Sequence, residues 1–265
     1  LRSGITVVDN RTGAVVALAG GIGEKTGNRI WNCATDSLRP PGSSIKPLGV
    51  YAPAMEAGLI LPSSAEDDTP FQQNSDGTLW PVNDEGYYSG LTDVDTAMTH
   101  SLNTIAVKVL DQLGLENSYD FLTEKFGIST LVKDYETSTG VIRSDLNYAP
   151  LALGGLTKGV STLEMASAYS VFVNDGKLKS STCYTKVTNK AGDIILEPTT
   201  TESDVLDAGV AWIMRNVLQT VVSEGIGSYA RVSGANVGGK TGTTSDSYDI
   251  WFDGFTANYS ASIWI

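Results

Sequence analysis

Residues 39–47 read Arg-Pro-Pro-Gly-Ser-Ser-Ile-Lys-Pro, and this stretch decides how the whole chain is interpreted. Within it, Ser43 and Lys46 stand three positions apart and Pro47 follows directly. Proline is tolerated best in the first turn of a helix, where its missing N–H would lack an intrahelical partner in any case. We therefore expect a helix to begin near Ser43 or Ser44, with Ser43 and Lys46 one turn apart on the same face.

The pairing of Ser43 with Lys46 suits nucleophilic catalysis. A serine hydroxyl is a poor nucleophile until a base takes its proton, and a lysine amine does so only when burial or a neighbouring cation lowers its pKa. A serine at a helix N-terminus also presents its backbone N–H to developing negative charge. The alternative is a serine N-cap followed by an exposed lysine, and this motif alone does not exclude it.

Two further short motifs follow along the chain. Ser101-Leu102-Asn103 precedes apolar residues at helical spacing, where Asn103 by itself could be a helix cap. Residues 239–244, Gly-Lys-Thr-Gly-Thr-Thr, read as a strand with Gly242 in its interior. A glycine there often marks the close approach of a ligand or of another backbone, and an extended peptide could pair with such a strand. The alternative is a glycine-weakened edge strand with a solvated Lys240.

Both ends of the chain read as β-strands. Residues 4–8 and 14–18 are β-branched runs on either side of a turn-rich segment, which predicts a hairpin. Near the other end, residues 236–244, 250–256 and 259–265 predict three more strands. A sheet assembled from the two termini follows from this arrangement.

The middle of the chain reads as helical. Ser161 to Glu164 has the form of a capping box, and apolar residues follow at helical spacing. Residues 205–222 predict a second helix, and residues 60–90 read as a long surface excursion. We therefore expect an α+β fold in three layers, in which helices cover an antiparallel sheet built from both chain ends.

Composition limits the classes of function. The 265 residues carry 30 Asp and Glu against 18 Lys and Arg, a net charge of −12, which argues against a nucleic-acid or anionic-membrane surface. No apolar run of about 18 residues occurs, so any signal or anchor lies outside this chain. Cys33 and Cys183 have no metal-ligand spacing, and we interpret them as two unpaired thiols.

The three motifs occur in the order Ser-x-x-Lys, Ser-x-Asn and Lys-Thr-Gly, which resembles the signature of penicillin-binding proteins and serine β-lactamases. The resemblance covers nearly the whole chain and is greatest to the bifunctional, class A penicillin-binding proteins. It implies one transpeptidase domain over residues 1–265 with the penicillin-binding protein/serine β-lactamase-like fold. It also implies a fragment that lacks the membrane anchor, the glycosyltransferase domain and the final helix. The stretches that carry it are residues 41–47, 151–155, 159–166 and 251–255.

By this resemblance Ser43 is the nucleophile and Lys46 its proton acceptor, with Ser101 and Lys240 completing a proton-relay and electrostatic network. The implied reaction is attack on the D-Ala-D-Ala end of a peptidoglycan stem peptide, followed by transfer of the acyl group to an amine of a neighbouring strand. β-Lactam antibiotics would acylate the same serine. The resemblance calls for no metal or organic cofactor. It places the domain at the extracytoplasmic face of a bacterial membrane, attached only through the missing anchor.

The substrate-binding residues implied by the resemblance are Asn103, Thr241, Gly242 and Thr243. Asn103 resembles the side-chain amide that holds the peptide bond of the substrate. The hydroxyls of Thr241 and Thr243 resemble the partners of its terminal carboxylate, and the backbone N–H groups of Ser43 and Thr243 resemble the oxyanion hole.

Three alternatives stay open at this point. A β-lactamase would share all three motifs, but Asp145 lies only two residues before Asn147 and so has the wrong spacing for the deacylating acid of one lactamase class. A D,D-carboxypeptidase differs only in using water as the acceptor. A β-lactam sensor or silent binding module would not need an activated nucleophile. The single histidine, His100, makes a Ser-His-Asp triad improbable.

Overall fold

The computed structural model describes residues 2–25 and 27–265. Its centre is a five-stranded antiparallel sheet in the order β13-β14-β15-β1-β2. The N-terminal strand β1 pairs with the C-terminal strand β15, from Gly4 opposite Trp264 to Asp9 opposite Tyr259. The expected sheet from both chain ends is therefore confirmed. The strands are β1 (Gly4–Asp9), β2 (Val15–Ala19), β13 (Gly238–Thr243), β14 (Ile250–Phe255) and β15 (Tyr259–Trp264).

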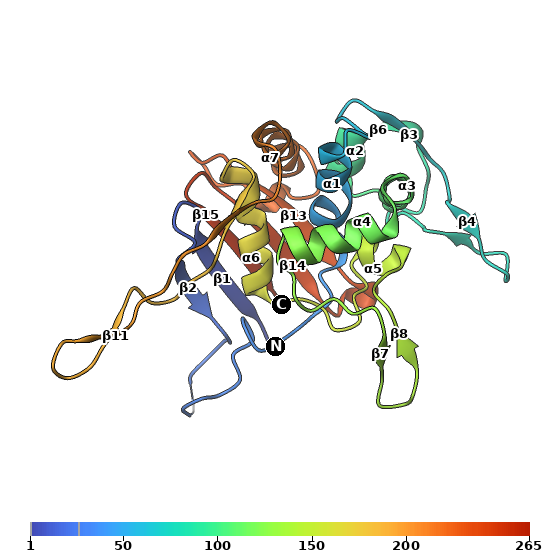
Figure 1. Cartoon of the computed structure of the whole chain (residues 1–265). Helices are drawn as coiled ribbons and strands as arrows, with labels where there is room; N and C mark the ends of the chain where they lie inside the picture. Colours follow the sequence, from blue (N-terminus) through green and yellow to red (C-terminus); the bar gives the residue numbers. More distant parts are fainter. Residues whose placement is uncertain (1, 26) are drawn as a thin grey trace.

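Helices fill the middle of the chain and cover the sheet, as the α+β interpretation requires. In Figure 1, α6 lies across the sheet, and α1 to α5 are gathered to one side of it. α6 packs on β1, β14 and β15, whereas α7 packs on β13. The helices are α1 (Ala52–Glu56), α2 (Val94–Thr99), α3 (Asn103–Leu113), α4 (Leu115–Asp120), α5 (Tyr148–Leu153), α6 (Thr162–Ser170) and α7 (Ala208–Ser223).

The start of α6 confirms the predicted capping box. The backbone N–H of Glu164 donates to the Ser161 hydroxyl at 3.2 Å, and the N–H of Ser161 donates to Oε2 of Glu164 at 2.9 Å. The start predicted for the second helix, residue 205, is wrong. α7 begins at Ala208, because Asp207 caps it by accepting the N–H of Gly209 at 2.7 Å.

Five pairs of short strands lie outside the central sheet in the described part of the chain. The predicted surface excursion over residues 60–90 is largely built of two of them, and its strand β3 packs against α3. The paired short strands are β3 (Ala65–Asp68) with β6 (Gly90–Asp93), β4 (Gln72–Gln73) with β5 (Leu79–Trp80), β7 (Tyr135–Glu136) with β8 (Ile142–Arg143), β9 (Lys177–Lys179) with β12 (Glu202–Asp204), and β10 (Val187–Thr188) with β11 (Ile194–Leu196).

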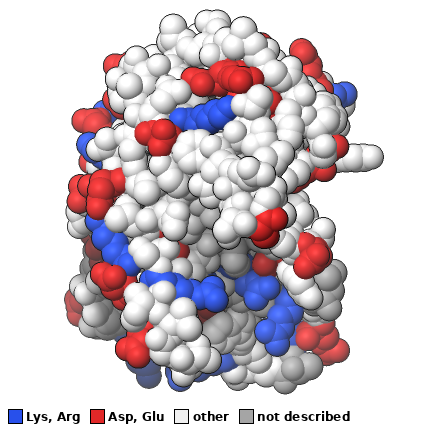
Figure 2. Space-filling view, turned by 90° about the vertical axis from the view of Figure 1, so that its right-hand side faces the viewer, with Lys and Arg blue, Asp and Glu red and all other residues white. Residues whose placement is uncertain are grey.

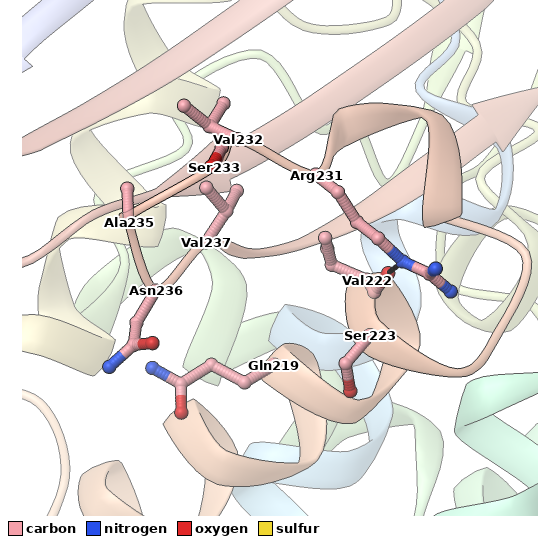
Figure 3. Close-up of a pocket in the computed structure, with 9 residues that line it drawn as sticks. All are labelled: Gln219, Val222, Ser223, Arg231, Val232, Ser233, Ala235, Asn236 and Val237. Atoms are coloured by element: carbon pink, nitrogen blue, oxygen red, sulfur yellow. Dashed lines mark hydrogen bonds between the residues drawn. The ribbon is translucent and has the colours of Figure 1, made fainter.

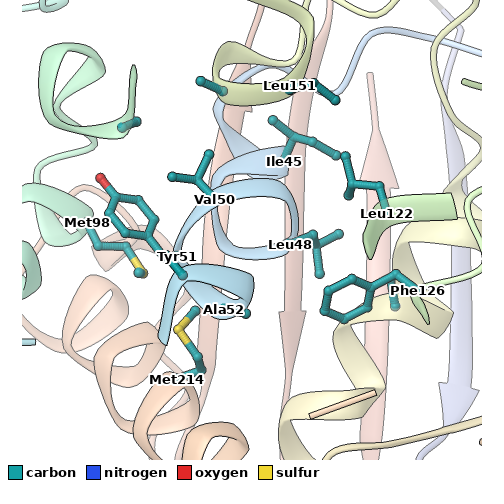
Figure 4. Close-up of a cluster of buried hydrophobic side chains, with 14 of the residues drawn as sticks. Ile45, Leu48, Val50, Tyr51, Ala52, Met98, Leu122, Phe126, Leu151 and Met214 are labelled. Atoms are coloured by element: carbon teal, nitrogen blue, oxygen red, sulfur yellow. The ribbon is translucent and has the colours of Figure 1, made fainter. Parts of the chain in front are cut away.

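The segment that carries Ser43 and Lys46 runs through the centre of the core. Ile45, Leu48 and Tyr51 are fully buried, and Figure 4 shows them among side chains of other helices and turns. Those neighbours include Met98, Leu122, Phe126, Leu151 and Met214. Close packing of this kind holds the buried side chains of the segment in fixed positions.

The predicted helix begins at Gly42, close to Ser43, but its first turns are not α-helical. It begins as a 3₁₀ turn, Gly42–Ile45, continues as a π-helical stretch, Pro47–Tyr51, and only then becomes α1. Pro47 explains the change, because it has no N–H to donate to the carbonyl of Ser43. The N–H of Lys46 donates to the carbonyl of Ser43 instead, and the N–H of Ala52 donates to the carbonyl of Pro47. Ser43 and Lys46 still share one turn.

Three glycines, Gly42, Gly154 and Gly242, allow the turn that carries Ser43 (the nucleophile turn, Gly42–Ile45) to pack closely against α5 and β13. A Cβ added at Gly242 in β13 would lie 2.0 Å from the carbonyl oxygen of Pro41, and one added at Gly154 would lie 2.1 Å from that of Gly42. Gly154 ends α5 with a positive φ of 74°. The interior glycine of the strand therefore marks the approach of another backbone.

We expect Gly154→Ala to lower the free energy of unfolding by well over the ~1 kcal/mol of left-handed backbone strain alone, because the new methyl group also meets the backbone of Gly42. Gly58→Ala is the matched control, since Gly58 has a φ of 68° with nothing within 4 Å of the added Cβ. Urea unfolding measures both variants. Equal losses would contradict the close approach.

Candidate active site

Lys46 is fully buried, and its ammonium group is held by the turn between α2 and α3. Nζ donates to the carbonyl oxygen of Ser101 at 2.7 Å and to Oδ1 of Asn103 at 2.7 Å. It also lies 3.2 Å from the Ser101 hydroxyl. The structure thus brings the first two sequence motifs together, and the alternative of an exposed lysine after Ser43 is wrong.

Lys240 approaches the same hydroxyl from the sheet. It is fully buried in β13, and its Nζ donates to Oγ of Ser101 at 2.8 Å. The alternative of a solvated Lys240 is therefore also wrong. The Ser101 hydroxyl lies between two amines, each within hydrogen-bond distance, so a proton can pass from one to the other through it.

The backbone at Ser101 is strained in order to make this contact. Its φ is 59°, in the left-handed region that non-glycine residues rarely adopt. Such conformations cost of order 1–3 kcal/mol and gather at functional sites. The strain turns the chain sharply between α2 and α3, so that both the carbonyl and the hydroxyl of Ser101 face Lys46.

Burial and like charge both disfavour protonated lysines at this site. Burial lowers the pKa of Lys46 well below its usual value, and the neighbouring Lys240 lowers it further. Burial also lowers the pKa of Lys240 to about 7. The exposed carboxylate of Asp84 opposes the shift at both amines. A neutral amine is therefore present near neutral pH, which is the condition for a lysine to act as a base.

Ser43 stands one turn before Lys46 in the same helical segment. It is partly exposed, unlike both lysines, and among the described residues its hydroxyl has no hydrogen-bond partner. Thr243 lies beside the same turn, because a Cβ on Gly42 would be 2.5 Å from the Thr243 carbonyl oxygen. An accessible hydroxyl next to buried amines can react with a substrate from solvent.

The predicted substrate-binding residues lie on two elements, α3 and β13. Asn103 is the first residue of α3, not its cap, and lies between Lys46 and the carbonyl of Val82. Thr243 is exposed beside the nucleophile turn. Thr241 lies on the face of β13 opposite Lys240, the face that it shares with Thr243, and lines a hollow with Ile250 and Phe252.

One buried carboxyl of the site escaped the sequence analysis. Asp253 in β14 stands directly opposite Lys240 in the sheet register and is fully buried. Neither of its oxygens has a hydrogen-bond partner of acceptable geometry among the described residues. Burial raises its pKa to about 7, although the nearby hydroxyls of Ser262 and Ser44 favour ionisation. Its position within an apolar strand gave no signal, because only the register reveals the partner.

A hollow larger than the one beside Thr241 lies elsewhere. It measures about 650 Å³ and lies between α7 and the loop that leads into β13; Gln219, Arg231 and Asn236 are among its lining residues. Figure 3 shows no residue of the Ser43 site among those lining it. On the face drawn in Figure 2, acidic side chains are scattered from top to bottom with basic ones among them.

The described residues hold no group of three or more His, Cys, Asp or Glu side chains arranged for a metal ion. Cys33 is buried and Cys183 is exposed, and they are unpaired, as expected. His100 is exposed. None of the helices in the described ranges is long and apolar enough to cross a membrane.

The site contains the Ser101 hydroxyl between two buried lysines, Lys46 from the central helical segment and Lys240 from β13. This geometry agrees with the family comparison. Residues 3–257 match the family described as the penicillin binding protein transpeptidase domain, and the chain belongs to this family.

Among individual proteins, the chain is 39% identical to penicillin-binding protein 1A of Clostridium acetobutylicum over 270 residues, covering 98% of this chain but only 32% of that protein. Penicillin-binding protein 1A from Haemophilus influenzae has a similar structure, with a TM-score of 0.80, 25% identity, and coverage of 99% of this chain and 42% of that one. Penicillin-binding protein 3 of Mycobacterium tuberculosis, solved with ampicillin, shares the fold with a TM-score of 0.82, 24% identity, and coverage of 100% of this chain and 66% of that one.

Asp253 leads to a prediction about pH. The pKa of Asp253 is about 7 in the folded protein and about 4 in the unfolded chain. Between these two pH values, the folded protein keeps a proton on Asp253 that the unfolded chain has lost. This contribution to stability is complete below about pH 4 and is lost as the pH rises through 7. Asp253→Asn does not titrate, so its unfolding free energy relative to the wild type should rise with pH, by up to about 4 kcal/mol. Thermal melts at about pH 5 and pH 8 measure the effect. An equal difference at both would refute the shifted pKa.

Proposed function

We propose that this chain is the catalytic domain of a serine-type peptidoglycan D,D-transpeptidase. The single observation that carries the proposal is the Ser101 hydroxyl, which lies 3.2 Å from Lys46 and 2.8 Å from Lys240, with the partly exposed Ser43 one turn before Lys46. A pure binding module has no need for two buried lysines with lowered pKa values. Because the chain spans only 32% of its relative from Clostridium acetobutylicum, the activity of the whole protein is also part of the proposal.

In the first half-reaction, the neutral amine of Lys46 accepts the proton of Ser43 as the serine oxygen attacks the carbonyl carbon of the penultimate D-Ala. The bond to the last D-Ala then breaks, and its amine leaves with a proton passed through Ser101. In the second half-reaction, an acceptor amine attacks the ester and Ser43 recovers its proton. The backbone N–H groups of Ser43 and Thr243 stabilise the oxyanion in both steps.

The substrate lies along β13, whose outer edge has no strand beside it among the described residues. An extended stem peptide can add to such an edge through main-chain hydrogen bonds. The exposed hydroxyl of Thr243 then meets the terminal carboxylate. Thr241, two residues earlier on the same face of the strand, stays in the proposal as a second partner. Asn103 remains the candidate for the peptide bond.

β-Lactams are proposed as acylating agents of Ser43, as the ampicillin complex of the Mycobacterium tuberculosis relative supports. The substrate and the relatives together support a location at the extracytoplasmic face of a bacterial membrane. A deacylating role for Asp145 has no support, because its carboxylate is buried and accepts the N–H groups of Val132 at 2.9 Å and Thr157 at 2.7 Å.

We expect penicillin to form one lasting covalent adduct on Ser43 and none on Ser43→Ala, because only the acylated oxygen is removed. Ser44→Ala is the matched control, since the Ser44 hydroxyl is buried and donates to the carbonyl of Pro41. Mass spectrometry of the intact protein and its peptides measures the adduct. Full labelling of Ser43→Ala would move the nucleophile elsewhere, and rapid return of unmodified protein would favour a lactamase.

A second experiment separates transpeptidation from D,D-carboxypeptidation. With a D-Ala-D-Ala stem peptide and a free amine acceptor, we expect a new amide product together with released D-Ala. Mass analysis of the products, with Ser43→Ala as the inactive control, makes the measurement. Hydrolysed peptide alone, at any concentration of the amine, would identify a carboxypeptidase.

A further inference from the structure

Val82 and Asn83, within the predicted surface excursion, contact Asn103 of the active site. Asn83 is almost fully buried, and its Oδ1 accepts the N–H of Asn103 at 2.8 Å and that of Thr104 at 3.4 Å. These are first-turn N–H groups of α3, which have no partner within the helix. The residue at the N-cap position, Leu102, has no side chain able to satisfy them. Asn83 therefore caps α3 from twenty positions earlier in the chain.

A buried carboxylate fixes the orientation of Asn83. Asp68, at the end of β3, is fully buried, and its Oδ1 accepts Nδ2 of Asn83 at 2.8 Å and the hydroxyl of Thr104. Its Oδ2 accepts the N–H of Ser89 at 2.7 Å. A carboxylate only accepts hydrogen bonds, so the Asn83 amide turns its NH₂ group toward Asp68 and its oxygen toward α3.

The same segment also holds the side chain of Asn103. Nδ2 of Asn103 donates to the carbonyl of Val82 at 2.8 Å, while Oδ1 of Asn103 accepts Nζ of Lys46 at 2.7 Å. The main chain and the side chain of Asn103 are thus fixed by two adjacent residues. If this hold is lost, Asn103 can turn, and the ammonium of Lys46 loses one of its two shortest hydrogen bonds.

We propose that Asn83, anchored by Asp68, is a positioning residue of the reaction that orients Asn103 and through it the amine of Lys46. It touches neither the nucleophile nor the substrate. The proposal rests on the proposed function, since it matters to catalysis only if Lys46 is the proton acceptor of Ser43. It assigns a role to a segment outside the three motifs.

A positioning role and a purely structural role predict different results. Loss of a helix cap costs about 1 kcal/mol of stability and changes nothing at Lys46. Loss of the Asn103 acceptor removes a hydrogen bond from protonated Lys46 and so lowers the pKa of its amine. The charged groups that act on Lys46 are Lys240 and Asp84, and Asp253 stands across the sheet from Lys240. An alanine at position 83 substitutes none of these three residues.

The test is the rate of acylation of Asn83→Ala by a fluorescent penicillin, measured across the pH range on the intact chain. We expect the rate to fall by about 10- to 100-fold, as misplaced catalytic groups cause. The acid limb of the rate profile should also move to lower pH. If Asn83→Ala does not fold, Asn83→Ser, which keeps a small polar group but is too short to span the two contacts, replaces it.

Asp207→Ala is the matched control, because it also removes a side-chain helix cap, that of α7. It should lose comparable stability in thermal melts and keep the rate and pH profile of the wild type. A folded variant at position 83 with wild-type rate and profile would overturn the proposal, and so would an equal shift in Asp207→Ala. Failure of the proposed function is seen separately, as absence of labelling on wild-type Ser43.

Discussion

The structure depends on one interaction, the hydroxyl of Ser101 held between two buried lysines. Burying two like charges side by side is unfavourable unless at least one gives up its proton, so the arrangement keeps an amine neutral near neutral pH. Lys46 comes from the central helical segment, Lys240 comes from the edge strand, and a strained turn at Ser101 lies between them. Displacement of any one of the three removes the shared contact. A rigid and tightly packed surrounding structure is therefore a requirement of the site.

The rest of the fold supplies that rigidity from distant parts of the chain. Strand β13 can carry Lys240 to the site only because β14 and β15 connect it to β1 at the other end of the chain. Glycines at positions 42, 154 and 242 remove the side chains that would separate the nucleophile turn from α5 and β13. Apolar side chains of the central segment are enclosed by helices, which hold Lys46 in place from behind. Close backbone contacts and side-chain packing thus both hold the catalytic residues in position.

Charge is distributed unevenly between this site and the surface. The chain as a whole has a net charge of −12, yet its site combines two amines with one buried carboxyl, Asp253, across the strand from Lys240. The pKa values of Lys240 and Asp253 both lie at about 7, so the protonation of this buried pair changes within the physiological range. Asp84, at the exposed edge, is the carboxylate that favours protonation of both amines. Small changes in local charge therefore alter the fraction of protein that is ready to react.

The sequence by itself determined the strands at both ends, the capping box at Ser161 and the motifs around Ser43, Ser101 and Lys240, because these depend on periodicity and on residues close together in the chain. It could not determine the 3₁₀ and π turns around Pro47 or the true start of α7, because packing and capping decide them. Only the tertiary structure placed Asp253 opposite Lys240 and brought Asn83 to the start of α3. The physical reason is that sheet register and long-range capping join residues that no local pattern connects.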